Sequence, residues 1–560
     1  MKRKLLKRGA LALAVGAIFP LAAQAAEPDL QVKIDELTRK MEQLKGQVER
    51  MEHKSLGKWL HIGGSYQFRM DSLHGKTKAY TDAMGSFGKM ANSMIGNGSA
   101  AGQGFETYLG LQQMQSDMMN ATNMARYNDF MTNYGATLGP LMMDSNNMDS
   151  KDPYKPRNST IYTNKFNLDI KAQATQNVSV NVKLGMYKTF GSQDDNAVNG
   201  NAFFADRTGV FDGTLSHVPS NSYLNVDRAY ATWSEILGEP IWLSVGRRPS
   251  TDGAPFNLKN NTARPGNGGT PSLLVNYAFD GMTLGYAPDI EALPGFYAKV
   301  CYGRGFDSGF RSTPNNSLKD TDMLGVAIIP YETDPLRVWF QWNRGFNIFD
   351  FPVMKNTAFG DTRPSTSLGD IDWFGLGAMS TLKNVGPGDL NFFVDGGISV
   401  TRPNNNVSGQ AMFQGLLSGS PFSPEAAKDK TGYAIYTGIR YDLPSKTKIG
   451  FEYNYGSKNW ITFAPAAEDM WTSKVGTRGH VFEPYIIQEL DLKPISSYFA
   501  KAFFKLGYQY YDFQYTGSNN WVGAPIKISD LGAYQANGGM LMQAPVKNAH
   551  DIYGTFVVQF

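Results

Sequence analysis

The sequence predicts an all-β protein, a transmembrane antiparallel β-barrel of about 16 strands with an N-terminal coiled-coil helix and a helical insertion in its first outer loop. Three observations predict this fold class. Apolar and polar residues alternate with a period of two from Lys58 onward. Long and short connections alternate between these segments, and the chain ends on a further alternating segment, "DIYGTFVVQF". Outer-membrane barrels combine these features.

The alternation is clearest in "NVSVNVKLGM", where Val178, Val180, Val182 and Leu184 occupy one face. "KFNLDIKA", "YAIYTGIRY" and "KIGFEYNY" repeat it, with charges on the polar face and aromatic residues on the apolar face. A soluble sandwich also alternates. The sequence is 13% aromatic, yet after its leader no segment reaches the roughly 18 consecutive apolar residues of a membrane helix. This composition favours lipid outside the barrel and water inside it.

The connections between strands supply an independent test of the barrel. Short connections are expected near residues 173–176, 236–239, 288–293, 331–335, 384–388, 442–446 and 493–496. Long connections are expected near residues 71–160, 189–221, 249–271, 305–320, 346–370, 402–430, 458–480 and 514–547. The Asp280-Gly281 pair normally indicates a hairpin. Because a hairpin would break the alternation, we interpret "LLVNYAFDGMTLGY" as one long strand with a β-bulge at this pair.

The last strand is predicted to close the barrel. Ile552, Phe556, Val558 and Phe560 fall on one face, a pattern that an edge strand of a soluble sheet could also show. Pairing with the first strand near His61–Arg69 would leave no free edge. A terminal phenylalanine on such a strand resembles the C-terminal signature of bacterial outer-membrane barrels. Phe560 is therefore the predicted assembly signal, and the barrel assembly machinery is a predicted partner.

The N-terminal residues predict export and a stalk. Residues 1–25 form a predicted secretory signal peptide, with a basic start, an apolar stretch and a small-residue cleavage site. In residues 27–55 the apolar positions follow heptad spacing, which predicts a periplasmic coiled coil. A single amphipathic helix on the barrel mouth is the alternative. The coiled coil could assemble a dimer or, through residues 30–51, a homotrimer, and residues 58–560 form the barrel.

Residues 71–160 form the first long loop and contain eleven methionines. Methionine could ligate Cu(I). It also fills irregular helical packing, and the segment shows weak helical spacing without a tight methionine array. We therefore expect a helical loop or plug insertion that folds over or into the lumen.

Several function classes find no support in the sequence. The net charge of +3 gives no nucleic-acid footprint. The single cysteine, Cys301, allows neither an internal disulfide nor a cysteine-based metal site. The six histidines are scattered, and no hydrolase, zinc-protease or phosphate-loop motif occurs. The sequence predicts no enzyme, no metal and no cofactor.

The strand register predicts which charged side chains face the lumen. The candidates for the lumen or its constriction are Arg69, Lys165, Lys171, Lys183, Arg247, Arg248, Lys299, Arg337, Arg440, Lys448, Lys501 and Lys505. The register also predicts that the acids Asp169, Asp227, Asp395 and Glu452 face inward, so the wall is positive on balance and would favour anions. If its cations are paired or solvated, the pore would have weak selectivity. Arg247 and Arg248 could narrow the pore, or they could form a lock with Asp227 or Asp252. Arg228 falls on the lipid face, unless a further bulge turns it inward.

Several segments resemble one bacterial protein family. They are "IYTNKFNLDIKAQATQNVSVNVKLGMYKTFG", "VDRAYATW", "WLSVGRRPSTDGAPFN", "NYAFDGMTLGYAP", "CYGRGFDSGF" and "LKDTDMLG". The family consists of porin-like outer-membrane proteins catalogued as a domain of unknown function. The resemblance is close over about residues 55–350 and loose beyond them. It implies an outer-membrane barrel with a signal peptide and a short coiled coil, and it brings no substrate or catalytic residue.

The sequence thus predicts a barrel in the lipid of the cell outer membrane. The expected function is passive diffusion of small hydrophilic solutes through a wet, charged lumen. The alternative is a non-conducting accessory barrel that scaffolds or sheathes a partner, such as an extracellular electron-transfer protein. Some members of the resembling family occur in bacteria that exchange electrons with extracellular solids. A blocked, apolar lumen would favour the partner role, and an open, hydrated lumen would favour the channel.

Overall fold

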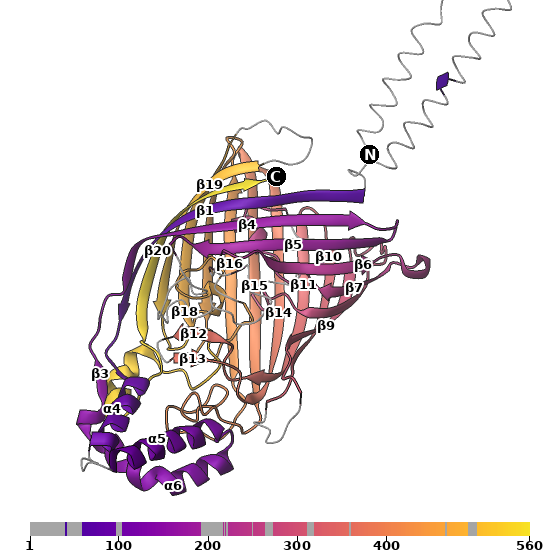
Figure 1. The fold of residues 1–560 in the computed structure, drawn as a ribbon. Helices are drawn as coiled ribbons and strands as arrows, with labels where there is room; N and C mark the ends of the chain where they lie inside the picture. The colour runs from indigo at the N-terminus through magenta and orange to yellow at the C-terminus, as the bar shows by residue number, and fades with distance from the viewer. Residues whose placement is uncertain are drawn as a thin grey trace, which may run out of the picture. The chain divides into compact units, whose positions relative to one another are not determined.

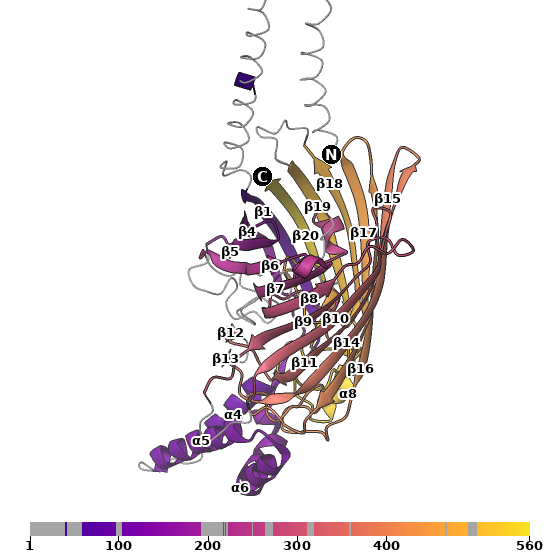
Figure 2. The same ribbon diagram turned by 90° about the vertical axis from the view of Figure 1, so that its right-hand side faces the viewer.

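The computed structural model describes residues 40–41, 59–96, 103–191, 217, 219, 222–248, 250–263, 273–310, 318–357, 360–464, 467–490 and 501–560. Within them, sixteen strands close into one barrel in the order β1-β20-β19-β18-β17-β16-β15-β14-β11-β10-β9-β8-β7-β6-β5-β4 (Figure 1, Figure 2). They are β1 (Leu60–Thr77), β4 (Arg157–Gln173), β5 (Val178–Thr189), β6 (Asn225–Trp233), β7 (Ile241–Arg247), β8 (Asp280–Tyr286), β9 (Tyr297–Phe306), β10 (Thr321–Glu332), β11 (Leu336–Phe349), β14 (Ser367–Val385), β15 (Gly388–Pro403), β16 (Thr431–Asp442), β17 (Thr447–Gly456), β18 (Gly479–Glu489), β19 (Lys501–Phe513) and β20 (Val546–Gln559). The predicted strand number is confirmed.

The last strand closes the barrel, as predicted. β20 pairs antiparallel with β1, placing Arg69 opposite Thr555 and Asp71 opposite Tyr553. Beyond the strand end, Gly64 and Phe560 exchange backbone hydrogen bonds of 2.8 and 3.0 Å. Long and short connections alternate along the described chain. We call the end of the barrel with the short turns the short-turn end, and the other the long-loop end.

The outer face of the barrel is apolar around its circumference. Leu376 and Val394 are each 53% exposed, Leu506 is 58% exposed and Ile552 is 53% exposed, and the last three each lie between two buried neighbours. A water-soluble protein rarely exposes so large a continuous apolar surface. Lipid removes this cost, and the closed ladder leaves no backbone group unpaired at a sheet edge. Antiparallel barrels with this outer face are the outer-membrane type, so the protein lies in the outer membrane.

Residues 273–279 correct one prediction. The expected bulged strand does not form, because β8 begins only at Asp280 and residues 273–279 leave the wall. Leu273 and Leu274 are fully buried, and Val275 forms a parallel bridge with Phe463 of another long loop. The alternation in this segment therefore packs apolar side chains inside the barrel. No hairpin forms at Asp280-Gly281, so the alternation of turns and loops is preserved.

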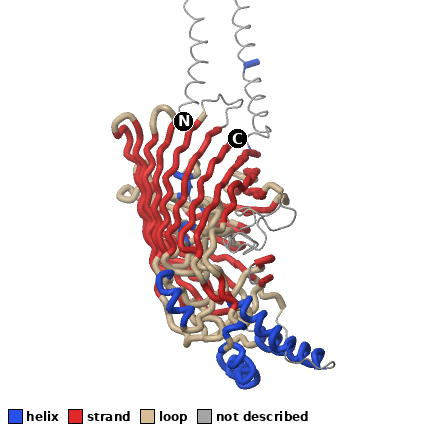
Figure 3. The backbone as a smooth tube through the Cα atoms, turned by 90° about the vertical axis from the view of Figure 1, so that its left-hand side faces the viewer, coloured by secondary structure: helices blue, strands red, loops and turns tan. Residues whose placement is uncertain are grey.

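The first long loop carries three helices beyond the long-loop end (Figure 1, Figure 3). They are α4 (Ala83–Gly96), α5 (Gln103–Asn120) and α6 (Met124–Met143), and their methionines pack against one another and against residues 407–422. The smaller elements are β2 (Tyr80–Asp82), β3 (Asp149–Lys151), β12 (Met354–Thr357), β13 (Gly360–Thr362), α7 (Phe256–Lys259) and α8 (Leu531–Ala536). Among the side chains of this helical cluster, methionine acts as packing material.

The predicted signal peptide and most of the predicted coiled coil lie outside the described residues. Of the segment 27–55, only Lys40 and Met41 are described, and both are helical. No helix in the described part of the chain is both long and apolar enough to cross a membrane.

We expect Phe560→Lys to reduce the amount of folded barrel in the outer membrane several-fold. The side chain is half exposed at the end of the lipid-facing row of β20. A charge near the interface costs the folded barrel only about 0–1 kcal/mol, so a loss would reflect assembly. The measurement is the fraction of heat-modifiable protein in isolated membranes, with Gln559→Lys as the control. A normal yield of the Phe560 variant would remove this residue from the assembly signal.

Candidate functional site

Most of the predicted lumen residues face the interior of the barrel, but loops cover them. The long loop between β7 and β8 starts at the long-loop end and enters the barrel. We call its residues 250–263 the inward segment. The loop between β17 and β18 also enters, through residues 467–478. Both loops place charged side chains against the wall, so the site consists of wall residues together with loop residues.

A cluster of buried ions joins both loops to the wall at mid-height. Lys474 of the β17–β18 loop contacts Glu452 of β17 and lies 2.6 Å from Glu483 of β18. Lys259 of the inward segment lies 2.7 Å from the same Glu483. All four side chains are less than a tenth exposed. Since charges this deeply buried are stable only when paired, the cluster fixes both loops in the lumen.

A second cluster surrounds Arg69 of β1. Its guanidinium lies 2.6 Å from Asp71 and 3.2 Å from Asp551, and it is fully buried. Glu468 of the β17–β18 loop lies 3.6 Å from Arg69 and 3.7 Å from Lys505. Burial alone would raise the pKa of Glu468, but nearby cations, Lys505 foremost, outweigh it and lower the pKa to about 2. Glu468 therefore remains ionised in all but strongly acidic solution.

Tyr553 connects the two clusters. Its hydroxyl donates a 2.8 Å hydrogen bond to Glu483, and the Arg69 guanidinium lies 4.1 Å from its ring centre. The ring lies directly over Gly507 of β19, where an added Cβ would come within 2.3 Å of it. Glycine at position 507 therefore creates the space in which this tyrosine lies flat against the wall.

The inward segment reaches the short-turn end. The Asn261 amide donates to Glu489 over 2.8 Å and accepts from Lys448 over 2.7 Å, and Lys501 donates to its backbone carbonyl over 3.1 Å. Glu489 also lies 2.8 Å from Lys448 and 2.7 Å from Lys501. All three partners lie at strand ends beside short turns. The inward segment therefore extends from the long-loop end to the short-turn end.

The cations of the wall are balanced by carboxylates, of which the strand register predicted only Glu452. The two clusters contain the cations Arg69, Lys165, Lys259, Lys474 and Lys505, and the carboxylates Asp71, Glu452, Glu468, Asp469, Glu483 and Asp551. Asp71, Glu483 and Asp551 lie on wall strands and follow the period-two pattern, so the register could have found them. Glu468 and Asp469 lie in a loop, where no periodicity marks them.

The arginines around β6 and β7 are arranged differently from either expectation. A bulge at Asp227 of β6 turns Arg228 inward, because the consecutive residues Lys183 and Leu184 of β5 pair with Arg228 and Val226. Arg228 lies 2.5 Å from Asp252 and 3.4 Å from Asp227. The lock to these aspartates therefore belongs to Arg228. Arg247 instead donates to the Val226 carbonyl over 3.0 Å.

The remaining predicted lumen residues lie outside the two charged clusters. Arg440 lies 2.7 Å from Asp442 and donates to the Leu258 carbonyl of the inward segment. Arg337 lies 2.9 Å from Glu332. Lys171 is exposed near the short-turn end of β4. Arg248 and Lys299 line a small cavity beside β9 to β11.

The other half of the lumen is filled with apolar side chains. Trp339 and Trp373 from the wall pack with Trp460, Phe463 and Trp521 from long loops. The Trp373 indole donates to the Ile461 carbonyl over 2.8 Å, and the Trp460 indole donates to the Val475 carbonyl over 2.7 Å. This apolar filling makes the loops part of the folded core.

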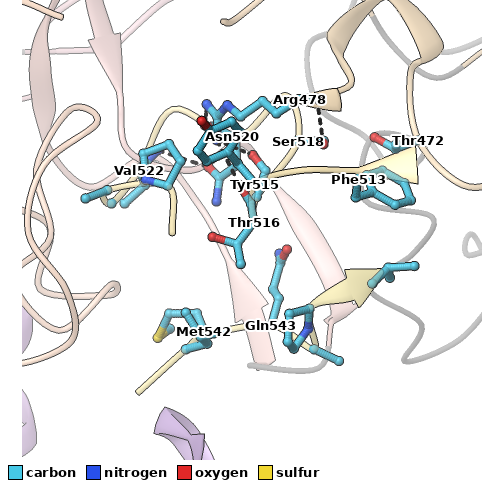
Figure 4. Close-up of a pocket in the computed structure, with 18 of the residues that line it drawn as sticks. Thr472, Arg478, Phe513, Tyr515, Thr516, Ser518, Asn520, Val522, Met542 and Gln543 are labelled. Atoms are coloured by element: carbon cyan, nitrogen blue, oxygen red, sulfur yellow. Dashed lines mark hydrogen bonds between the residues drawn. The ribbon is translucent and has the colours of Figure 1, made fainter. Parts of the chain in front are cut away.

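A cavity of about 120 Å³ lies at the long-loop end. Figure 4 shows Arg478, Ser518 and Asn520 on one side of it and Met542 and Gln543 on the other. The Arg478 guanidinium donates to several loop carbonyls, the shortest bonds being 2.6 Å. Its charge therefore holds the loops of the cavity together.

Comparison with known proteins identifies a family. The model of a family described as "Protein of unknown function (DUF3373)" matches residues 155–560. The match thus extends well beyond residue 350, where the sequence resemblance appeared loose. No curated protein matches the sequence of the chain.

Three solved structures are similar at low sequence identity. OmpT of Vibrio cholerae, in its trimer form, is 11% identical, with 90% of this chain and 100% of that chain covered and a TM-score of 0.36. An anion-selective porin from Comamonas acidovorans is 10% identical, with 90% and 99% covered and a TM-score of 0.37. Salmonella typhi OmpF in complex with daunomycin is 8% identical, with 90% and 97% covered and a TM-score of 0.37. The chain, matched by its family over residues 155–560, belongs to the DUF3373 family of proteins of unknown function.

Proposed function

We propose that this protein is an outer-membrane channel of the porin type, for passive diffusion of small hydrophilic solutes, and that its own loops hold it narrow. One observation carries the proposal. The inward side chains of β19 run from Phe513 at the 120 Å³ cavity through Tyr511 and Gln509 to Lys505 and Lys501 at the short-turn end. Gly507 and the apolar Phe503 complete this inward row, and most of its side chains are buried beneath the loops. The polar groups of the row therefore mark a narrow route for solutes along the wall.

The mechanism requires no covalent chemistry. Fixed charges and hydrogen-bonding groups along the path replace part of a solute's hydration shell, which lowers the cost of crossing the hydrocarbon layer. The inward segment sets the size limit, because it occupies the lumen along its length. Since the wall cations are paired with carboxylates, weak charge selectivity follows more directly than an anion preference.

A second candidate is a non-conducting accessory barrel that holds a partner, such as an extracellular electron-transfer protein. The packed aromatic side chains of the lumen favour it, because an apolar filling excludes water. In either role, a homotrimer through residues 30–51 remains a proposal.

Single-channel conductance of the purified full-length protein in a planar bilayer, under a KCl gradient, tests the proposal. We expect small, stable conductance steps with a reversal potential near zero. A reversal potential displaced toward that of chloride would instead support an anion preference. A folded, heat-modifiable barrel that never conducts would overturn the channel and support the accessory role.

A further inference from the structure

A small cavity behind the wall contains an unusual set of buried donors. It has a volume of about 30 Å³ and lies between β9 to β11 and the start of the β7–β8 loop. The side chains that matter here are Arg248, Lys299, Gln341 and Asn343, each less than a tenth exposed. No carboxylate occurs among the described residues that line it. The lining therefore places two buried cationic side chains beside two buried amides.

Two N–H donors in this lining lack hydrogen-bond partners. The Nε atom of Arg248 is buried without a partner, and so is the amide nitrogen of Asn343. The Gln341 amide donates to Asn343 over 3.0 Å, which leaves the Gln341 oxygen as an unsatisfied acceptor. If both amides were flipped, the Gln341 amide nitrogen would replace that of Asn343 as the unsatisfied donor, and Arg248 Nε would be unchanged. A buried unsatisfied donor is costly, and one on a charged group is the most costly.

We propose that this cavity binds a small inorganic anion of halide size. An anion would accept hydrogen bonds from Arg248 and the amide donor, and it would compensate the buried positive charge. A cavity needs a volume of about 10–15 Å³, measured in the same way, to hold one water molecule. With about 30 Å³, this cavity has room for a chloride-sized ion but excludes organic solutes. Arg248 begins the β7–β8 loop, so the bound ion fastens the start of this loop to the wall. The site does not depend on whether the barrel conducts.

Thermal unfolding of the full-length protein in detergent tests the site. The melting temperature is measured by tryptophan fluorescence in sodium chloride and in sodium gluconate of equal ionic strength, because gluconate is too large for the cavity. We expect a higher and saturable melting temperature in chloride, since a ligand that binds only the folded state stabilises it. Bromide should reproduce the effect, and bromide-soaked crystals should show an anomalous peak beside Arg248.

Variants separate this site from general salt effects. Arg248→Gln should lose the difference between chloride and gluconate. Gln341→Glu should supply a built-in anion, so that its melting temperature in gluconate matches that of the wild type in chloride and rises no further. The control, Arg402→Gln, removes an exposed arginine paired with Asp372 and should keep the full difference. Equal melting temperatures of the wild type in both salts, or an undiminished difference in Arg248→Gln, would overturn the proposal.

Discussion

Replacement of Lys474 by methionine is expected to lower the free energy of unfolding by about 3–5 kcal/mol, the cost of breaking a buried ion pair by removing one partner. Lys474 is 2% exposed and contacts Glu452, which is 1% exposed. Without it, Glu452 would keep only the 2.6 Å hydrogen bond from the Tyr436 hydroxyl. Glu483 would keep Lys259, so the loss falls mainly on Glu452. Urea unfolding of the refolded barrel, followed by tryptophan fluorescence, measures the effect.

Two further variants test the reason for this loss. Lys474→Met combined with Glu452→Gln removes the orphaned charge and should recover most of the stability. Lys383→Met removes a lysine that is 67% exposed and 2.6 Å from Asp389. This exposed pair should contribute less than about 1 kcal/mol. A Lys474 variant as stable as the Lys383 variant would mean that water screens the central cluster, and the loops would then need another anchor.

The architecture of the wall was predictable because its signals are local. The period of two marks each strand, and the length of each connection marks its end of the barrel. The same local rule found the inward positions of Arg69, Lys448 and Lys505. It also could have found Glu483, since this residue alternates with Phe482 and Pro484 on β18.

The contents of the lumen were not predictable, because they depend on long-range packing. Residues 273–279 alternate like a strand, yet they pack against Phe463 and other loop residues inside the barrel. Lys259 and Lys474 lie in irregular loops, where no period indicates which way a side chain points. The predicted positive lumen left out the wall carboxylates Asp71, Glu483 and Asp551. The loops add Glu468 and Asp469 to the clusters, but they also add Lys259 and Lys474.

Release of the inward segment is expected to raise the unitary conductance several-fold. The double variant Lys259→Met with Asn261→Gly removes the 2.7 Å ion pair to Glu483 and both side-chain hydrogen bonds at the short-turn end. Glycine suits position 261 because Asn261 has a φ of 53°, a conformation that glycine adopts without strain. The segment would lose its side-chain anchors at mid-height and at the short-turn end, while the ion pair of Asp252 with Arg228 near its start would remain. Bilayer recordings of the purified variant and wild type provide the measurement.

The matched control is Lys383→Met with Asn384→Gly. It makes the same two substitutions at a short turn, and Asn384 also has a positive φ, of 57°. Because these residues lie outside the lumen, the control should conduct like the wild type. Equal conductance of the two double variants, with both barrels folded, would mean that the inward segment stays in place through its remaining contacts, among them the Asp252–Arg228 ion pair and the Arg440 and Lys501 bonds to its backbone. The size limit would then be set by the aromatic filling around Trp460, and Trp460→Ala would be the variant that widens the path.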